Sequence, residues 1–345
     1  MPAYDFAPGC PACGADADEE VASADDVRAE LEALWDFHTR RLDPATPPER
    51  LTDRLTFSQR PPLRLVRCAS CGLVYRNPRE RAWELTDAYA GEEPTEKTMR
   101  ALFETQRGAY RSQARRLTAV AGRAGRGLEV GSYVGGFLAA SRELGWHFEG
   151  LDINAAAQRF AEGLGHTVHA GEIEALAAAA PAPYDAVAFW NCLDQLPDPR
   201  AALAAAARLT RPGGVLAVRV PSGAFYSNVR RLIAAAPDRG ASRASRWVRA
   251  PLVAAACALL AHNNLLAFPY RFGFSVPALR RAFAAAGFRV VRVAGDSLVP
   301  IADRYTRPWA RWEEWVVKRA LRAAAAARAD AAPWIEVYGV REQGG

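Results

Sequence analysis

Lysine is almost absent from this chain of 345 residues, and arginine carries nearly all of its positive charge. Together with the abundance of alanine, this indicates the codon bias of a GC-rich genome, so the formal net charge of +6 says little by itself. Acidic residues, however, are missing from one long segment. Residues 208–292 contain fourteen arginines and a single acid, Asp238, whereas residues 16–32 are rich in acids. Codon bias does not explain this uneven distribution of charge.

The chain also lacks a long apolar run. The most apolar stretch, Leu252–Ala261, has about half of the roughly 20 residues that a membrane-spanning helix needs. The first twenty residues contain five acids and no apolar run, so they do not resemble a signal peptide. We therefore expect a cytoplasmic protein without a transmembrane segment, long enough for one large domain and a smaller one.

Six cysteines are present, and four of them form two Cys-x-x-Cys pairs, Cys10/Cys13 and Cys68/Cys71. In a reducing compartment such pairs more often bind a metal than form a disulfide. Four thiolates suit tetrahedral Zn²⁺ and leave no open position for a substrate, so the metal would be structural. The gap between the pairs exceeds that of a simple zinc ribbon, which we explain by a helix inserted over residues 19–42. The alternative is that the pairs are turns without metal.

Strand and helix patterns alternate after residue 122, which argues for a parallel sheet with helices on both faces. An arginine-rich, mostly helical insertion over residues 222–275 interrupts this alternation. We expect a zinc-ribbon-like module over residues 1–79, a helical linker over 80–121, and the α/β domain over 122–345. Near the C-terminus, the three-residue spacing of Trp309, Trp312 and Trp315 is that of one helix face, which favours core packing over a stacking surface.

A glycine-rich turn is the most informative motif. Glu129 ends a strand, Gly131 begins a tight turn, and Gly135 opens a helix, so the backbone can approach a ligand closely. Tyr133 stands where the dinucleotide motif needs glycine, and the Gly-Lys-Ser/Thr of a phosphate loop is missing. An acid here disfavours a pyrophosphate and suits a cationic amino acid. Asp152, at the end of the next strand, can accept hydrogen bonds from both hydroxyls of a ribose.

With these motifs the sequence resembles the class I S-adenosylmethionine (SAM) dependent methyltransferases from about residue 107 to 341. It is most similar to the subgroup with N-terminal Cys-x-x-Cys pairs. The resemblance implies a Rossmann-like seven-stranded sheet whose last strand is antiparallel, with SAM as cofactor. Gln195 replaces the family's common histidine, so a general base is missing there, and Tyr133 replaces a common glycine, so its ring is expected beside the cofactor. The residues that the resemblance assigns to cofactor binding are Glu129, Gly131, Ser132, Tyr133, Gly135, Asp152, Ile153, Glu172 and Asn191.

In this family the acceptor lies above the carboxyl ends of the strands, under insertions such as residues 222–275. His262 and Tyr270 are the clearest titratable candidates for a catalytic base in the insertion, although either could be a hydrogen-bonded structural residue. The excess of arginine favours an anionic small-molecule acceptor, such as a sugar nucleotide or a secondary metabolite, bound by Arg230 or Arg271.

Two alternatives stay open for the arginine-rich segment. It could form a basic outer face that contacts an anionic membrane peripherally beside Leu252–Ala261. The chain could also be an RNA- or ribosome-associated methyltransferase, or a nucleic-acid-binding protein, that uses its zinc module and arginines. We expect no nucleic-acid partner, because the zinc module also carries an acidic helix. The sequence does not decide the oligomeric state.

Overall fold

A computed structural model describes most of the chain. The ranges that it describes are 4–5, 9–16, 18–47, 63–80, 91, 94–179, 181–235, 253–269, 271–297 and 305–342. The candidate base Tyr270 lies outside the described residues, as do the insertion arginines Arg243 and Arg246.

Seven strands form the central sheet, in the order β12-β13-β10-β9-β6-β7-β8. Within this sheet β13 runs antiparallel to its neighbours β10 and β12, while the remaining pairs are parallel. The predicted Rossmann-like methyltransferase sheet is therefore confirmed, including its antiparallel last strand. The strands span β6 (Arg126–Val130), β7 (His147–Asp152), β8 (Val168–Ala170), β9 (Tyr184–Trp190), β10 (Thr210–Pro221), β12 (Phe288–Asp296) and β13 (Trp334–Arg341).

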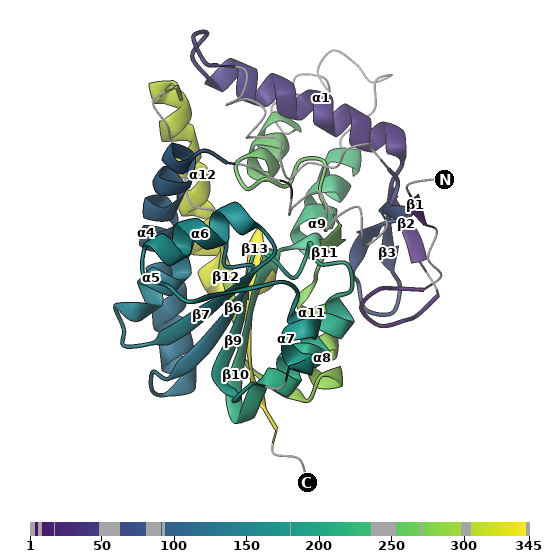
Figure 1. Cartoon of the computed structure of the whole chain (residues 1–345). Helices are drawn as coiled ribbons and strands as arrows, with labels where there is room; N and C mark the ends of the chain where they lie inside the picture. The colour runs from purple at the N-terminus through teal and green to yellow at the C-terminus, as the bar shows by residue number, and fades with distance from the viewer. Residues whose placement is uncertain are drawn as a thin grey trace, which may run out of the picture.

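Helices cover both faces of this sheet (Figure 1). The central strands are apolar on both sides for this reason, and the residues of β9 after Asp185 are all buried. One face packs against α4 (Glu96–Ala121), α5 (Gly136–Arg142) and α6 (Ala155–Gly163), and the other against α7 (Ile173–Ala178), α8 (Pro199–Leu209) and α11 (Val276–Ala285). The helix expected in the linker is α4, and its Tyr110, Ala114 and Leu117 join the core beside the sheet.

The N-terminal module contributes three strands to a second sheet, in the order β11-β4-β3-β2. They are β2 (Asp18–Ala22), β3 (Leu65–Cys68) and β4 (Val74–Arg76). The fourth strand, β11 (Phe272–Gly273), comes from the insertion some 200 residues later and pairs antiparallel with β4. Two further short strands, β1 (Tyr4–Asp5) and β5 (Arg79–Glu80), pair with each other. The module is thus joined to the large domain by a shared sheet.

The helix predicted over residues 19–42 is α1 (Ala24–Arg41), since residues 18–22 form β2 instead. Ser23 caps α1 in a reciprocal capping box with Asp26, which explains the start of the helix. Its apolar face packs with the insertion, in a cluster that includes Val27, Leu34 and Phe37. The insertion supplies α9 (Gly223–Ala235) and a helix over 253–261 to that cluster. The 253–261 helix is therefore largely buried.

The long helix near the C-terminus is α12 (Pro308–Ala327), followed by a 3₁₀ turn (Ala329–Ala331). The prediction that its tryptophans pack in the core is wrong: Trp309, Trp312 and Trp315 are 49%, 68% and 54% exposed. Their spacing does define one face, but that face is turned to solvent. The buried face instead carries Ala310, Leu321 and Ala325 with a buried Glu314–Lys318 ion pair of 2.6 Å. These five positions are three or four residues apart, so they lie on one side of the helix.

None of the helices in the described part of the chain is both long and apolar enough to cross a membrane.

Candidate active site and metal centre

The glycine-rich turn joins the carboxyl end of β6 to α5. Gly131 has a φ of 71°, and a Cβ at this position would lie 2.6 Å from the sulfur of Cys192. Both the backbone conformation and the close approach therefore require glycine. The amide of Gly131 donates a hydrogen bond of 2.8 Å to the carbonyl of Leu151 on β7, which fixes the turn against the neighbouring strand. Gly135, with a φ of 77°, then begins α5.

Glu129 lies at the carboxyl end of β6, one residue before Val130 closes the strand. Its side chain is buried, and its Oε2 has no hydrogen-bond partner among the described residues. Burial, with a contribution from the charge of Asp152, raises the pKa of Glu129 well above its usual value. A buried acceptor without a partner is costly, so this oxygen is placed to receive a cationic or hydrogen-bonding ligand.

Asp152 lies at the carboxyl end of β7. One carboxylate oxygen accepts a 2.7 Å hydrogen bond from the amide of Tyr133, and the other accepts a 2.9 Å bond from the amide of Asn154. These bonds hold the carboxylate between the glycine-rich turn and the start of α6. Burial still raises the pKa of Asp152, against the lowering effect of those amides. Each oxygen keeps a second lone pair, so the group can still accept bonds from a diol.

The other predicted cofactor residues lie along the same edge of the sheet. Tyr133 has a φ of 43°, and its ring packs against a cluster that contains Met99 and Phe103 of α4. Ser132 is buried, and its hydroxyl has no partner in the described part of the chain. Ile153 is half-buried directly after β7, and Glu172 is the exposed residue that precedes α7.

Asn191 directly follows β9 and adopts a φ of 58°. Its side chain is held on both sides: Nδ2 donates to the hydroxyl of Tyr110 at 3.1 Å, and Oδ1 accepts from Arg219. Arg219, at the carboxyl end of β10, also contacts Asp296 at 3.0 Å. From Asp296 the network continues to Gln113 of α4, at 3.0 Å. The sequence signals did not identify Tyr110 or Arg219, because neither belongs to a local motif.

A second buried acid lies close to this edge. The backbone carbonyl of Asp194 accepts a hydrogen bond from the amide of Phe272 in β11, which ties the loop after β9 to the second sheet. The Oδ1 of Asp194 has no hydrogen-bond partner among the residues described, and burial raises its pKa to about 7. Burial, with smaller contributions from the charges of Asp152, Asp194 and Glu129, raises the pKa of Cys192, whose sulfur lies under Gly131. The carboxyl edge of the sheet therefore concentrates acidic side chains.

His262 does not join these residues. Its ring stacks edge-on against Phe37 of α1 with centroids 4.9 Å apart, and its Nε2 lies 3.5 Å from Glu313 of α12. Burial lowers the pKa of His262, so the imidazole is neutral near pH 7. Arg41 contacts the same Glu313 through two hydrogen bonds of 2.7 and 2.8 Å. His262 thus lies where the insertion meets α1 and α12.

The insertion arginines differ in their surroundings. Arg230 is directed to Glu30 of α1, a half-buried acid that also accepts bonds from Tyr226 and from the amide of Ala267. Arg271 is buried beside β11, next to the loop that carries Asp194. The charge of Arg230 is therefore already neutralised by acids of α1.

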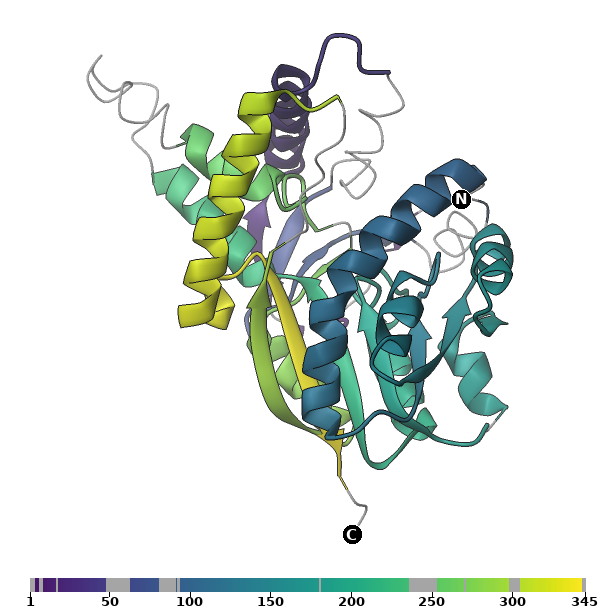
Figure 2. The same ribbon diagram turned by 90° about the vertical axis from the view of Figure 1, so that its left-hand side faces the viewer.

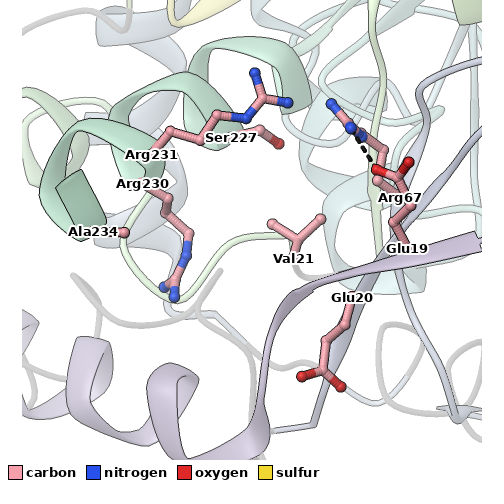
Figure 3. A pocket seen from close by; sticks show the side chains of 8 residues that line it. All are labelled: Glu19, Glu20, Val21, Arg67, Ser227, Arg230, Arg231 and Ala234. Atoms are coloured by element: carbon pink, nitrogen blue, oxygen red, sulfur yellow. Dashed lines mark hydrogen bonds and ion pairs between the residues drawn. The ribbon is translucent and has the colours of Figure 1, made fainter.

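A hollow lies between α9 and the strands β2 and β3 (Figure 3). Arg67 in its wall pairs with Glu19, and Arg231 donates to Asn228. Acidic and basic side chains both line the hollow, so it has no strong preference for one sign of charge. The residues that line it are Glu19, Glu20, Val21, Arg67, Ser227, Arg230, Arg231 and Ala234.

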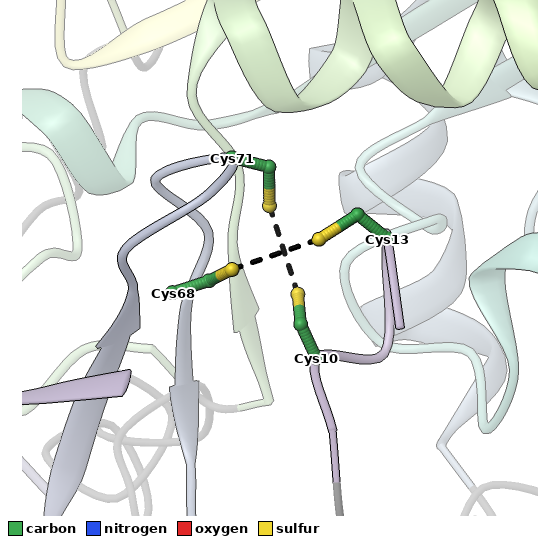
Figure 4. A group of neighbouring side chains, drawn as sticks. All are labelled: Cys10, Cys13, Cys68 and Cys71. Carbon is green, nitrogen blue, oxygen red and sulfur yellow. Dashed lines mark hydrogen bonds between the residues drawn. The ribbon is translucent and has the colours of Figure 1, made fainter. Parts of the chain in front are cut away.

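The four paired cysteines converge at one point (Figure 4). The sulfurs of Cys10 and Cys71 lie 3.6 Å apart, as do those of Cys13 and Cys68, and all four lie within 4.8 Å of one another. Tetrahedral Zn²⁺ with Zn–S bonds of about 2.3 Å places its sulfurs about 3.8 Å apart, so the spacing fits the metal. A hydrogen bond with Cys71 lowers the pKa of Cys10 to about 5.

The cysteine cluster lies against the large domain. Three of the four cysteines belong to the same apolar core as β9, α8 and α11. The hydroxyl of Ser275, which caps α11, donates to the carbonyl of Cys71 at 3.0 Å, and Arg281 of α11 donates to Ser70 at 2.8 Å. The turn that carries Cys68 and Cys71 is therefore held directly by the α/β domain.

The chain matches a family model described as a methyltransferase domain over residues 102–293. A search of the curated proteins found no match. Among solved structures, a chain in the complex between the Haloferax volcanii Trm112 methyltransferase activator and a methyltransferase is 17% identical, with a TM-score of 0.46, covering 75% of this chain and 98% of that one. A SAM-dependent methyltransferase from Archaeoglobus fulgidus is 15% identical, with a TM-score of 0.42 and coverage of 75% and 99%. A SAM-dependent methyltransferase from Thermotoga maritima is 18% identical, with a TM-score of 0.42 and coverage of 76% and 100%.

The family match covers more than half of the chain and includes the glycine-rich turn, Asp152 and the loop after β9. It agrees with the strand order of the sheet and with the acidic edge around Glu129. The chain therefore belongs to the methyltransferase-domain family and is a SAM-dependent methyltransferase.

Proposed function

We propose that this methyltransferase holds SAM at the carboxyl ends of β6 and β7 and transfers its methyl group to an anionic small molecule. The observation that carries the first part is the buried Oε2 of Glu129, which has no hydrogen-bond partner in the described residues. An oxygen in that position is satisfied by the ammonium group of an amino acid. SAM supplies both this ammonium and an electrophilic methyl group on its sulfonium.

The neighbouring residues divide the rest of the cofactor between them. The free lone pairs of Asp152 accept the two ribose hydroxyls, while the amides of Tyr133 and Asn154 keep its carboxylate in place. Gly131 and Gly135 allow the backbone to pass close to the ligand, with Ser132 between them. Ile153 and Glu172 flank the adenine side, and Asn191 closes the site at the end of β9.

The support for an anionic acceptor comes from Arg271. Its side chain is buried, and the residue directly precedes β11, next to the loop after β9. A buried arginine near the carboxyl edge favours a phosphate or carboxylate on the acceptor. His262 is the candidate base within the described residues: burial lowers its pKa, so its imidazole is neutral at pH 7, but its contacts are with Phe37 and Glu313 and not with the cofactor residues.

We also propose that Cys10, Cys13, Cys68 and Cys71 hold one structural Zn²⁺. The support is the spacing of their sulfurs and the absence of a disulfide among them. Because the cluster packs against α11 through Ser275, the metal would stabilise the attachment of the module and take no part in methyl transfer.

One experiment separates the two parts of the proposal. SAM affinity is measured by calorimetry, and methyl transfer from radiolabelled SAM is measured with a panel of sugar nucleotides and the matching neutral sugars. We expect Asp152→Asn to weaken SAM binding, and Arg271→Gln to raise the KM for the charged acceptors only, with SAM binding unchanged. Faster transfer to the neutral sugars would contradict an anionic acceptor but leave the SAM site intact.

A further inference from the structure

The outward face of α12 carries an unusual concentration of exposed aromatic rings. Trp309, Trp312 and Trp315 are about half to two thirds exposed, and Val316 beside them is 37% exposed. Figure 2 shows α12, in yellow-green, on the outside of the molecule and beside α1. With about 250 Å² for each tryptophan side chain, the three rings leave on the order of 400 Å² in contact with water. A patch of this size on a soluble protein marks an interaction surface.

The charges on the same face are all positive. Arg311, Arg319 and Arg322 are exposed, and no ion pair joins them to an acid within the described ranges. Of the two acids of α12, Glu314 is buried and Glu313 is half-buried, and both are paired. Glu313 is held by Arg41, and Glu314 forms the buried pair with Lys318. The exposed face therefore combines tryptophan and arginine without an acid, whereas the opposite face packs into the core through Val317 and Leu321.

We propose that this face of α12 docks on the surface of an anionic lipid bilayer. Tryptophan rings are amphipathic and concentrate in the interfacial layer of a membrane, where the ring is partly in apolar surroundings and its N–H reaches water or headgroups. Arginine at the same level binds the phosphates of anionic lipids. The guanidinium of Arg319 lies 5.3 Å from the centre of the Trp315 ring, so both groups are already directed to the same side.

The geometry of α12 favours a membrane over the other partners of such a face. Successive tryptophans three residues apart are rotated by about 60° around the helix axis, so the three rings fan out over a convex surface. Diverging rings enter a soft interface easily, but they do not form the platform on which consecutive nucleic-acid bases stack. A second copy of the chain would bring Arg311, Arg319 and Arg322 against their own counterparts, which like charges oppose.

The test is flotation of the full-length, zinc-loaded protein with lipid vesicles. We expect binding to vesicles of equal parts phosphatidylglycerol and phosphatidylcholine, little binding to phosphatidylcholine alone, and weaker binding at 0.5 M than at 0.1 M salt. The double variant Trp312→Ser/Trp315→Ser should reduce the partition coefficient at least tenfold. Arg319→Glu should reduce it at least fivefold, because each basic residue near an anionic surface contributes about that factor.

Matched controls keep the result specific to α12. Leu144→Ser removes an exposed apolar side chain from the turn after α5, and Arg159→Glu reverses an exposed charge on α6; neither should change the partition. All the replaced side chains are exposed, so melting temperatures and SAM affinity should match the wild type. The two measurements are independent: loss of vesicle binding with normal SAM affinity concerns only this inference, whereas failure to bind SAM concerns only the proposed function.

Several outcomes would overturn the membrane proposal. The wild type could fail to float, or the α12 variants could float as well as the wild type. Equal loss of binding in the Leu144 and α12 variants would show that the effect is not located on α12. Tryptophan-dependent binding of poly-U RNA without vesicle binding would assign the face to nucleic acid. Tryptophan-dependent dimers in sedimentation, without vesicle binding, would assign it to a second copy.

Discussion

Replacing Glu129 with glutamine tests the cofactor site most directly. The substitution keeps the size of the side chain and the fit at the end of β6, but it removes the negative charge. We expect the dissociation constant for SAM to rise by roughly 10- to 150-fold. A hydrogen bond to a charged group contributes about 1.5–3 kcal/mol, and about 1.4 kcal/mol corresponds to a tenfold change in affinity.

The protonation of Glu129 has opposite effects on SAM affinity and on the stability of the fold, so the two should change with pH in opposite directions. Burial raises the pKa of Glu129 in the unliganded fold above its value in the unfolded chain, about 4.3. Its contribution to stability is therefore complete below about pH 4.3 and is lost as the pH rises through the folded pKa. SAM affinity has the reverse sign, because the carboxylate is the form that pairs with an ammonium. Binding below the folded pKa must then release a proton.

The assay is calorimetry of SAM binding between about pH 5.5 and 8.5 in two buffers with different ionisation enthalpies. The difference between the buffers counts the protons released by the wild type, and Glu129→Gln should abolish the release that Glu129 contributes. Asp194 titrates in the same range, with a pKa of about 7. The comparison should therefore be repeated in an Asp194→Asn background.

Equal SAM affinity in the wild type and the glutamine variant, with the same proton release, would refute the assignment of Glu129. An unfolded variant is not expected, because glutamine removes a buried charge without creating a cavity. Thermal unfolding without SAM provides the control: above the folded pKa the variant should be at least as stable as the wild type.

The remaining predictions concern the acids, the metal and the glycine-rich turn. Asp152→Asn should weaken SAM binding by about 10-fold or more in calorimetry, and an unchanged Kd would remove Asp152 from the site. Asp194→Asn should raise the free energy of unfolding at pH 8 by up to about 4 kcal/mol but not at pH 4, because the stability that this acid gives is present below pH 3.8 and lost through about pH 7; a pH-independent effect would show another cause. Elemental analysis should find about one zinc per chain, lost in Cys71→Ser but kept in the control Cys257→Ser, and full zinc in both variants would disprove the Cys₄ site. Gly131→Ala should destabilise the fold by about 1–3 kcal/mol, measured by denaturant unfolding, because its φ is 71° and its Cβ would collide with Cys192.

The sequence alone was enough to predict the sheet and to group the candidate cofactor residues at one of its edges. Strand and helix periods alternate locally, and the acid, the glycines and Asp152 all lie at strand ends, where the parallel fold brings them to one edge. The cysteine pairs could be recognised as a candidate metal site for a similar reason, since each pair lies in a tight turn of its own. Short-range spacing carries these signals, so no knowledge of distant contacts was needed.

Contacts between segments that are distant in the sequence determined the features that the sequence did not predict. The pairing of β4 with β11 joins residues some 200 positions apart, and no local pattern marks Phe272 as a strand of the cysteine module. The network of Tyr110, Asn191 and Arg219 likewise assembles from α4, β9 and β10. Each of these side chains has an ordinary local sequence, and only the packing of the helices on the sheet brings them together.

The tryptophans of α12 show most clearly what helical periodicity in the sequence does not predict. Periodicity established that Trp309, Trp312 and Trp315 share one face of a helix, but it does not say which face is buried. That choice was made by Val317 and Leu321, which pack in the cluster with α1 and the insertion, and by the buried Glu314–Lys318 pair. The sequence by itself determined the helix and its faces, because these depend on neighbours three and four residues away. Only the tertiary structure decided which face meets water, because burial depends on the shape of a surface built from the rest of the chain.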